Sequence, residues 1–466
     1  SKPFVKQRVE MKTTIVILAA GEGTRMKSST PKSLHRVAGK SMLRHIVDTT
    51  SNIEPEQLIV VHSPNTEDII KEELFETKTT FVEQDKPLGT GHALRAANPS
   101  IEKNNAVIVL LADVPLIRQR TINQLKNNLS DNKLVILTAE VENPKGYGRI
   151  LRDDKGHIKS IIEESECSES EKKIKEINTG IMAFAPDKLE NWLQQLDANN
   201  TKGEYYLTDV IKIAYDEGSS VGAIRAESEM EVFGVNDKKD LAKAEQAIRE
   251  EKANELLEAG VTLADPSRVD VRGTLTCGTD VYIDIGTVFV GDVTIGDNVK
   301  IGPYSLIKDS RIGNNSKILS HCNIEQATIG SSCNVGPFAR VRPGTELMSE
   351  VKIGNFVETK KSTIGDGSKV NHLSYIGDAE IGKNTNIGAG TITCNYDGAN
   401  KHKTVIEDDV FIGSGVELVA PITVKKGATV GAGSTISKSV DEGKLTLERG
   451  DRKTLNNWKR PTKKET

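Results

Sequence analysis

Several features that mark particular classes of protein are missing from this sequence. Its cysteines are few, odd in number and scattered, and none has CxxC spacing. Neither a zinc site nor a disulfide framework is therefore indicated, and we expect reduced thiols in a cytoplasmic protein. The five cysteines are Cys167, Cys277, Cys322, Cys333 and Cys394.

Long apolar runs and an excess of one charge are missing as well. No apolar stretch approaches the roughly 20 residues of a membrane span, and no signal peptide opens the chain. The formal net charge is only −4, from 62 Lys and Arg against 66 Asp and Glu. We therefore expect neither a membrane partner nor a nucleic-acid partner.

The 466 residues exceed one ordinary core, so two or more domains are expected. Up to about residue 240, continuous Val/Ile/Leu runs alternate with amphipathic stretches, which favours an α/β domain with a mostly parallel sheet covered on both faces. These runs are Thr14–Leu18, Leu58–Val61, Ala106–Leu111 and Leu134–Thr138.

The second half follows a different pattern. From Ile295 to Val341 aliphatic residues recur every six, six and five positions, and the series returns at Ile364–Ile387 and Ile406–Ile436. Glycine often follows the aliphatic residue, as at Ile301 and Ile312. This hexapeptide period indicates a parallel β-helix with the aliphatic side chains inside. The longest break, Thr391–Val405, predicts an extruded loop of the kind that often carries function.

The domain limits follow from these patterns. Residues 239–260 are rich in Ala, Glu, Lys and Leu, end at a glycine, and predict a connecting helix. We expect an N-terminal extension over 1–10, an α/β domain over 11–238, the helix over 239–260, the β-helix over 261–450 and a basic tail over 451–466.

A glycine-rich segment, LAAGEGTRM at 18–26, directly follows the first predicted strand. It has neither the GxxxxGK[ST] pattern of a P-loop nor the dinucleotide-binding GxGxxG pattern. Its small residues still let backbone N–H groups approach a phosphate, and Arg25 and Lys32 add positive charge. Taken alone, a plain strand–helix connection remains the simpler interpretation.

Asp113 follows the apolar run that ends at Leu111. This places its carboxylate at the C-terminal edge of a parallel sheet, where ligands bind in open α/β folds. Mg²⁺ uses one or two such protein ligands and takes the rest from phosphates and water. A helix N-cap is the alternative role.

These segments together resemble the sugar-1-phosphate nucleotidyltransferases. Further motifs narrow the resemblance to the bifunctional N-acetylglucosamine-1-phosphate uridylyltransferase/glucosamine-1-phosphate acetyltransferase family, and it runs from about Met11 to the C-terminus. The broader resemblance also includes Gln84 and LGTG at 88–91. The narrower one depends on GYGR at 146–149, Glu163, EINTG at 176–180, EYYLTD at 204–209 and FGVN at 233–236, followed by the β-helix.

The resemblance implies a Rossmann-like nucleotidyltransferase domain and assigns roles in it. It implies that UTP and N-acetylglucosamine-1-phosphate react there with Mg²⁺ and that the sugar phosphate attacks the α-phosphorus without a covalent enzyme intermediate. The implied contacts are Leu18, Ala19, Ala20, Gly21 and Lys32 to the nucleotide, Gln84, Gly89 and Thr90 to uracil, Gly148, Glu163 and Asn178 to the sugar, Asp113 and Asn236 to Mg²⁺, and Arg25 to the departing pyrophosphate.

The β-helix does not by itself specify an acetyltransferase, so its function depends on particular residues. A lone histidine such as His372 is more often structural or solvated, yet acetyl transfer to an amine needs a base near neutrality. Arg342 and Lys360 suit a phosphate on the same substrate, because cations on successive coils stack on one face.

The resemblance completes this second set of roles. It implies a left-handed β-helix, acetyl-CoA and glucosamine-1-phosphate as substrates, and a homotrimer with the site between neighbouring β-helices. The implied residues are His372 as general base, Arg342, Lys360, Tyr375 and Asn386 for the sugar phosphate, and Ala389, Asn395, Tyr396, Ser414, Ala432 and Arg449 for acetyl-CoA.

Two alternatives stay open from the sequence. The first is a nucleotidyltransferase with a single activity whose β-helix is structural or regulatory. The second is an inactive scaffold that binds nucleotide sugar. The His372/Tyr375 and Arg342/Lys360 pairs argue against the first alternative, and Arg25, Lys32 and Asp113 argue against the second.

Overall fold

The computed structural model describes residues 11–200 and 202–460, so the predicted extension 1–10 and the last part of the predicted tail, 461–466, lie outside the described residues. The chain divides into two compact units, Ser1–Ile248 and Arg249–Thr466. The division falls within helix α7 (Lys238–Glu258), which occupies the segment predicted to connect the halves. The domain boundaries themselves stay predictions.

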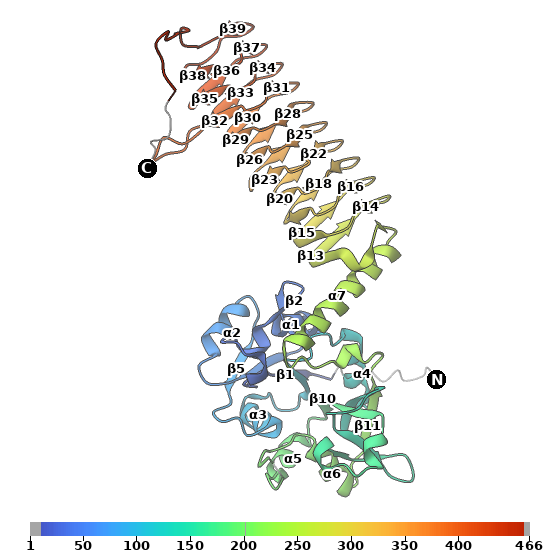
Figure 1. Ribbon diagram of the computed structural model, residues 1–466. Helices are drawn as coiled ribbons and strands as arrows, with labels where there is room; N and C mark the ends of the chain where they lie inside the picture. The colour runs from blue at the N-terminus through green and yellow to red at the C-terminus, as the bar shows by residue number, and fades with distance from the viewer. Residues whose placement is uncertain (1–10, 201, 461–466) are drawn as a thin grey trace, which may run out of the picture. The chain divides into compact units, whose positions relative to one another are not determined.

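A mixed sheet forms the centre of the first unit (Figure 1). The strand order is β11-β7-β10-β6-β1-β4-β5, and in this row only β10 runs antiparallel to its neighbours. The bounds are β1 (Thr13–Leu18), β4 (Gln57–His62), β5 (Thr80–Glu83), β6 (Ala106–Leu111), β7 (Leu134–Glu140), β10 (Glu176–Phe184) and β11 (Val221–Arg225). The hairpin β8 (Arg149–Arg152) and β9 (Ile158–Ile162) attaches to β10. The short pair β2 (Arg36–Val37) and β3 (Lys40–Ser41) stands apart from this sheet.

Helices cover both faces of this sheet, as predicted. Along β1, Ile15 and Ile17 belong to one buried cluster and Val16 to the other, because successive side chains of a strand point to opposite faces. The first cluster includes residues of α1 (Met42–Ser51), α2 (Glu67–Glu73) and α4 (Gln119–Asn128). The second includes residues of α3 (Thr90–Ala97), α5 (Leu189–Gln195) and α6 (Asp209–Asp216).

The second unit is a parallel β-helix, which confirms the interpretation of the hexapeptide period. Its short strands form three stacks, which we call faces A, B and C. Face A is the 11-stranded sheet β12 (Thr262–Leu263), β14 (Tyr282–Ile283), β16 (Lys300–Ile301), β19 (Lys317–Ile318), β22 (Asn334–Val335), β25 (Lys352–Asn355), β28 (Lys369–His372), β31 (Asn386–Ile387), β34 (Phe411–Ile412), β37 (Thr429–Val430) and β39 (Leu445–Thr446).

Faces B and C belong to one 17-stranded sheet, which begins with the long strands β13 (Val269–Cys277) and β15 (Thr287–Ile295). Face B contains β17 (Leu306–Lys308), β20 (Asn323–Glu325), β23 (Arg340–Val341), β26 (Glu358–Lys360), β29 (Tyr375–Gly377), β32 (Ile392–Cys394), β35 (Glu417–Val419) and β38 (Thr435–Ile436). Face C contains β18 (Arg311–Ile312), β21 (Thr328–Ile329), β24 (Glu346–Leu347), β27 (Thr363–Ile364), β30 (Ala379–Ile381), β33 (Thr404–Ile406) and β36 (Ile422–Val424).

Aliphatic side chains fill the interior of the β-helix. Ile301 pairs with Ile318, and Ile318 pairs with Val335 on the next coil, and all three are buried. Each coil thus returns after about 17 residues. At the predicted break the offset grows, so that Ile381 pairs with Ile406. The extra residues form a loop, closed by an antiparallel bridge between Tyr396 and Lys401, as the break in the period predicted.

Helix α7 contributes to the cores of both units. Ala244 and Ile248 are buried with Val37, Met42 and Val235 of the first unit. Farther along the helix, Ala253 and Leu256 join the aliphatic core of the β-helix. None of the helices in the described part of the chain combines the length and apolarity that crossing a bilayer requires.

Candidate active sites

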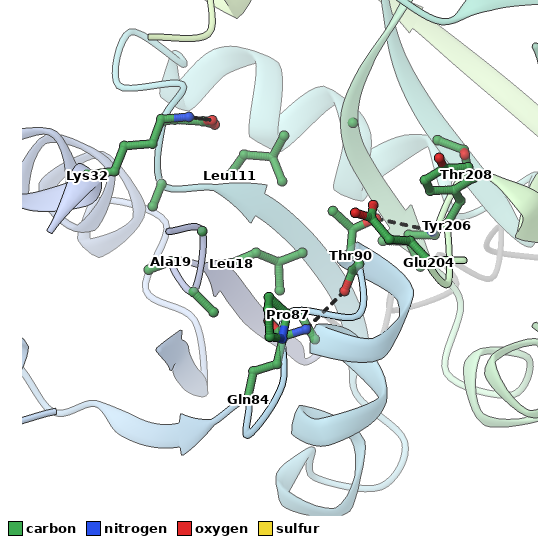
Figure 2. Close-up of a pocket in the computed structure, with 18 of the residues that line it drawn as sticks. Leu18, Ala19, Lys32, Gln84, Pro87, Thr90, Leu111, Glu204, Tyr206 and Thr208 are labelled. Carbon is green, nitrogen blue, oxygen red and sulfur yellow. Dashed lines mark hydrogen bonds and ion pairs between the residues drawn. The ribbon is translucent and has the colours of Figure 1, made fainter. Parts of the chain in front are cut away.

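A cavity of about 430 Å³ opens at the carboxyl edge of the first sheet (Figure 2). Its wall is built where β1, β5 and β6 end, because parallel strands bring their carboxyl ends to one edge. Eleven of the predicted residues line it: Leu18, Ala19, Ala20, Gly21, Lys32, Gln84, Gly89, Thr90, Asp113, Glu163 and Asn178.

Positive charge gathers at one side of this cavity. Lys32 Nζ lies 2.5 Å from Asp113 Oδ2 and donates to Asn236 Oδ1 at 3.0 Å. Arg25 does not line the cavity, but its Nη2 donates to the same Asn236 oxygen at 3.0 Å. The structure therefore joins all four predicted residues in one network. Two cations here suit the phosphates of a nucleotide.

The LGTG segment has glycines because another segment crosses it closely. Gly89 has φ 101°, and a Cβ there would lie 2.6 Å from the carbonyl oxygen of Tyr205. The Gly91 N–H donates to that carbonyl at 2.8 Å, and Tyr205 N–H donates to Leu88 at 2.8 Å. The EYYLTD segment is thereby held against the cavity, and its Glu204, Tyr206 and Thr208 line the side opposite Lys32 (Figure 2).

Gln84 presents a defined hydrogen-bonding edge. Its side chain is buried, and Nε2 donates to Gly89 O at 3.1 Å and to His92 Nδ1 at 3.1 Å. Both amide hydrogens are thus engaged, which leaves Oε1 as an acceptor in the cavity wall. An acceptor at this position suits a ring N–H such as that of uracil.

The three predicted sugar contacts also lie together. Asn178 N–H donates to Gly148 O at 2.8 Å. A Cβ on Gly148 would lie 2.8 Å from Ile161 Cγ2 and 3.4 Å from Glu163 Oε1, so only glycine lets β8 pack this closely beside the carboxylate. Burial raises the pKa of Glu163. Burial and the charges of Asp197, Glu163 and Glu166 raise the pKa of nearby Asp209 to about 6. This acidic side suits neutral hydroxyl groups better than phosphate.

In the β-helix, His372 shares one edge with the predicted acetyl-CoA contacts. Hydrogen bonds between successive coils join neighbours of these residues: Gly390 N–H donates to His372 O, Gly415 N–H to Ala389 O and Gly433 N–H to Ser414 O. Ala432 precedes Gly433, and a Cβ on adjacent Gly431 would lie 3.1 Å from Arg449 Nη2. His372, Ala389, Ser414, Ala432 and Arg449 therefore follow one line along the prism.

Asn355 fixes the tautomer of His372. Asn355 pairs with His372 in the register of face A, and its Oδ1 lies 3.1 Å from His372 Nδ1. Because an amide oxygen only accepts, Nδ1 carries the hydrogen and Nε2 keeps its lone pair. The exposed His372 imidazole is thus ready to take a proton at Nε2.

Three of the four predicted sugar-phosphate ligands of the β-helix lie on or next to face B, whereas His372 lies on face A. Lys360 and Tyr375 belong to face B, and Arg342 follows a face B strand and donates to Glu358 at 2.8 Å. Asn395 donates to Asp378 at 2.5 Å and to Tyr375 Oη at 3.3 Å. Tyr396, like Asn395 a predicted acetyl-CoA contact, is exposed and forms the bridge that closes the loop, and the sugar-phosphate ligand Asn386 lies on face A. The structure therefore does not gather this set around one cavity within a single chain.

A row of large side chains marks the corner between faces A and B. We call Tyr304, His321, Phe338, Phe356 and Leu373 the corner ladder. All five have φ between 48° and 57°, and the rings of His321, Phe338 and Phe356 stack with centroids 4.8 and 5.4 Å apart. Beyond Leu373 the same corner carries Gly390, Gly415 and Gly433. The corner thus carries large side chains on the coils before His372 and only glycines on the coils after it.

Comparison with protein families supports this division of the chain. Residues 15–203 match the model of the MobA-like NTP transferase domain, residues 271–355 match the GMPPB C-terminal domain, and residues 403–438 match the bacterial transferase hexapeptide with six repeats. The first match spans most of the cavity wall, and the last includes Ser414 and Ala432.

Curated relatives cover nearly the whole chain. "Bifunctional protein GlmU" from Marinobacter nauticus is 47% identical over 449 residues, which is 96% of this chain and 99% of that protein. The proteins of the same name from Ralstonia nicotianae and Cupriavidus pinatubonensis are 48% and 50% identical, over 97% of this chain and 99% of each protein. The chain belongs to the GlmU family.

Some residues at both GlmU sites were not assigned from the sequence. Tyr206 and Thr208 line the cavity, and the EYYLTD motif that contains them was the available signal. Asn355 lies 17 residues before His372, and only the coil register reveals this contact. Lys401 lies over the Tyr396 ring at 4.3 Å in the extruded loop.

The Asp113–Asn236 pair fits the Mg²⁺ that the family resemblance implies. A carboxylate and an amide oxygen from separate segments converge on one cation, the Lys32 ammonium. These are oxygen ligands of the kind that Mg²⁺ takes from proteins, with phosphates and water completing its shell. Within residues 11–200 and 202–460, no group of three or more His, Cys, Asp or Glu converges on a metal site.

This geometry predicts that Lys32 competes with a divalent cation. In Lys32→Met, Asp113 loses its ammonium partner. Since Mn²⁺ then no longer has to displace an ion pair of about 1 kcal/mol, we expect it to bind roughly fivefold more tightly in the absence of nucleotide. Electron paramagnetic resonance of free Mn²⁺ measures this affinity. Lys27→Met, an exposed lysine of the same loop, is the control and leaves the affinity unchanged. Unchanged or weaker binding in Lys32→Met would contradict competition.

Proposed function

We propose that this GlmU chain makes UDP-N-acetylglucosamine in two steps. The β-helix transfers an acetyl group from acetyl-CoA to glucosamine-1-phosphate, and the first unit joins the product to UTP with release of pyrophosphate. The observation that carries this proposal is the common edge of His372, Ala389, Ser414 and Ala432, because a purely structural β-helix needs no base beside an edge without side chains at its corner. The single-activity alternative leaves this arrangement without a purpose.

The cavity of the first unit supports uridylyl transfer through the distribution of its charges. Arg25 and Lys32 lie where the triphosphate binds, and Gln84 Oε1 accepts from the N3–H of uracil. Glu163 and Asn178, on the acidic side, accept and donate hydrogen bonds to the sugar. Two substrates bound in this order bring the sugar phosphate next to the α-phosphorus.

The reaction in this cavity is a displacement at phosphorus. An oxygen of the sugar phosphate attacks the α-phosphorus of UTP, and the bond from that phosphorus to the bridging oxygen breaks, so pyrophosphate leaves with the electron pair. The nucleophile is already an anion, so the chain supplies positioning and positive charge. Arg25 stabilises the departing pyrophosphate. When bound, Mg²⁺ at Asp113 and Asn236 neutralises phosphate charge.

The β-helix supports acetyl transfer to an amine. Nε2 of His372 takes a proton from the glucosamine ammonium, and the free amine attacks the thioester carbonyl. The carbon–sulfur bond then breaks, and the nitrogen gives its second proton to the departing CoA thiolate as the amide forms. Arg342 and Lys360 bind the sugar phosphate. The corner glycines Gly390, Gly415 and Gly433 leave the edge beside His372 without side chains, so the long arm of acetyl-CoA can lie along it.

The separation of these groups supports a homotrimer. In one chain the corner ladder stands between His372 on face A and the cations on face B. Two chains packed along their β-helices bring face A of one beside face B of the next, and three such contacts close a ring. Four ladder residues are exposed apolar side chains, as expected of a surface that another chain covers.

We also propose that the protein acts in the cytoplasm. All five cysteines are free thiols in the structure, including Cys322 and Cys333, which are both buried in the β-helix. Reduced cysteines and the use of UTP and acetyl-CoA fit a reducing compartment that contains both metabolites.

Two single substitutions should separate the two activities. His372→Ala removes the base, so we expect acetyl transfer to fall by a factor of about 10² to 10⁴ while uridylyl transfer stays near the wild-type rate. Asp113→Ala should instead lower uridylyl transfer and leave acetyl transfer near the wild-type rate. Thiol release from acetyl-CoA with glucosamine-1-phosphate measures the first activity, and pyrophosphate release from UTP with N-acetylglucosamine-1-phosphate measures the second. Wild-type protein without substrate-dependent thiol release would favour the single-activity alternative.

The corner ladder provides a test of the trimer. Phe338→Asn combined with Phe356→Asn keeps residues that tolerate positive φ but removes the apolar rings. We expect monomers in sedimentation analysis, loss of acetyl transfer and unchanged uridylyl transfer. Phe75→Asn, at an exposed phenylalanine of the first unit, is the matched control and stays trimeric. A ladder variant that remains trimeric, or a wild-type chain that is monomeric, would contradict the proposal.

A further inference from the structure

Among the described residues of the first unit, the most deeply buried cation has no part in the chemistry given above. Arg149, the first residue of β8, has a side chain only 1% exposed. A guanidinium removed from water is costly unless hydrogen bonds and a counter-charge replace its hydration. Such a group in a fold of this size calls for a specific set of partners.

Three partners surround Arg149. Nη2 lies 2.6 Å from Glu164 Oε2 and donates to the carbonyl of Lys172 at 3.5 Å, and Nη1 donates to the carbonyl of Tyr147. The guanidinium lowers the pKa of the Glu164 carboxyl. Glu164 and Lys172 stand near opposite ends of the connection 163–175 between β9 and β10, which contains only the short 3₁₀ turns Glu164–Glu166 and Glu171–Lys173.

Two of these three contacts, with Glu164 and Tyr147, adjoin a predicted sugar contact in the chain. Glu163 precedes Glu164, and Gly148 lies between Tyr147 and Arg149 in the chain. Asn178 donates to Gly148 O, and the residue before it, Ile177, pairs with Arg149 in the sheet register. Glu163 is thus next to the carboxylate that pairs with the guanidinium, and Gly148 and Asn178 are linked to the backbone of β8 beside Arg149.

We propose that Arg149 is a positioning residue for the sugar substrate. Its guanidinium fixes the connection 163–175 against β8, so that the Glu163 carboxylate stays packed against Gly148 and lines the cavity together with Asn178. Arg149 itself touches no substrate. This inference rests on the proposed function, and it specifies which interaction holds the sugar-binding side while the nucleotide-binding side is built from other segments.

The same strand provides a matched control. Arg152, the last residue of β8, forms two hydrogen bonds with Glu176, at 3.0 and 2.8 Å, and is partly exposed. Glu176 and Arg152 do not line the cavity. Arg152→Met therefore removes an arginine–glutamate pair from β8 without touching the connection 163–175.

Steady-state kinetics and calorimetric binding on the full chain test the proposal. In Arg149→Met we expect the KM and the Kd for N-acetylglucosamine-1-phosphate to rise tenfold or more, while the KM for UTP stays within twofold. Arg149→Lys keeps the charge without the planar fork and should fall between wild type and Arg149→Met. Arg152→Met should leave both constants unchanged.

If Arg149→Met does not fold, Glu164→Gln decides, because it removes only one partner, and that partner is 32% exposed. We expect a smaller rise in the KM for the sugar phosphate in the same direction, again without an effect on UTP. Equal changes for both substrates, or no change in either variant, would overturn the positioning role. Failure of the proposed function is distinguishable, because the wild-type chain would then not use N-acetylglucosamine-1-phosphate at all.

Discussion

Parallel pairing of strands is the constraint on which both units depend. In the first unit it brings the ends of β1, β5 and β6 to one edge, so that Leu18, Gln84 and Asp113 meet although they are far apart in the sequence. In the β-helix it aligns residues about 17 positions apart, so that Asn355 meets His372. Strand pairing therefore brings functional side chains together in both units. In the first unit the strand ends converge at one edge of the sheet, and in the β-helix successive coils stack on one another.

The two modes of collection have different consequences. Convergence at a sheet edge makes a concave cavity that one chain completes, with cations on one side and carboxylates on the other. Stacking on a prism makes flat faces that meet at convex corners, and groups on two faces point away from each other. The residues of the corner ladder also hold large side chains at positive φ, which non-glycine residues rarely adopt. An arrangement with these features fits a surface completed by another chain.

Sequence patterns revealed whatever depends on local periodicity. The Ile-Gly hexapeptides predicted the β-helix, and the break at 391–405 predicted the loop, because both patterns are formed by residues close together in the chain. The antiparallel direction of β10, the contact of Asn355 and the burial of Arg149 depend on register between distant strands. The corner ladder has no sequence signal, because Tyr, His, Phe and Leu at intervals of 17 or 18 residues share a backbone conformation rather than a chemical type.

Lys32 and Arg149, two cations of the first unit to which roles are assigned above, differ in how far they are buried. Lys32 is 14% exposed beside an Asp113 that is 30% exposed, and a compact ammonium with water nearby can exchange its carboxylate for a phosphate at little cost. Arg149 is enclosed by a carboxylate and two carbonyls, and removing any of them leaves charge without hydration. The accessible pair therefore suits a site whose partners change during turnover, whereas the enclosed one suits a scaffold that must keep Glu163 in place.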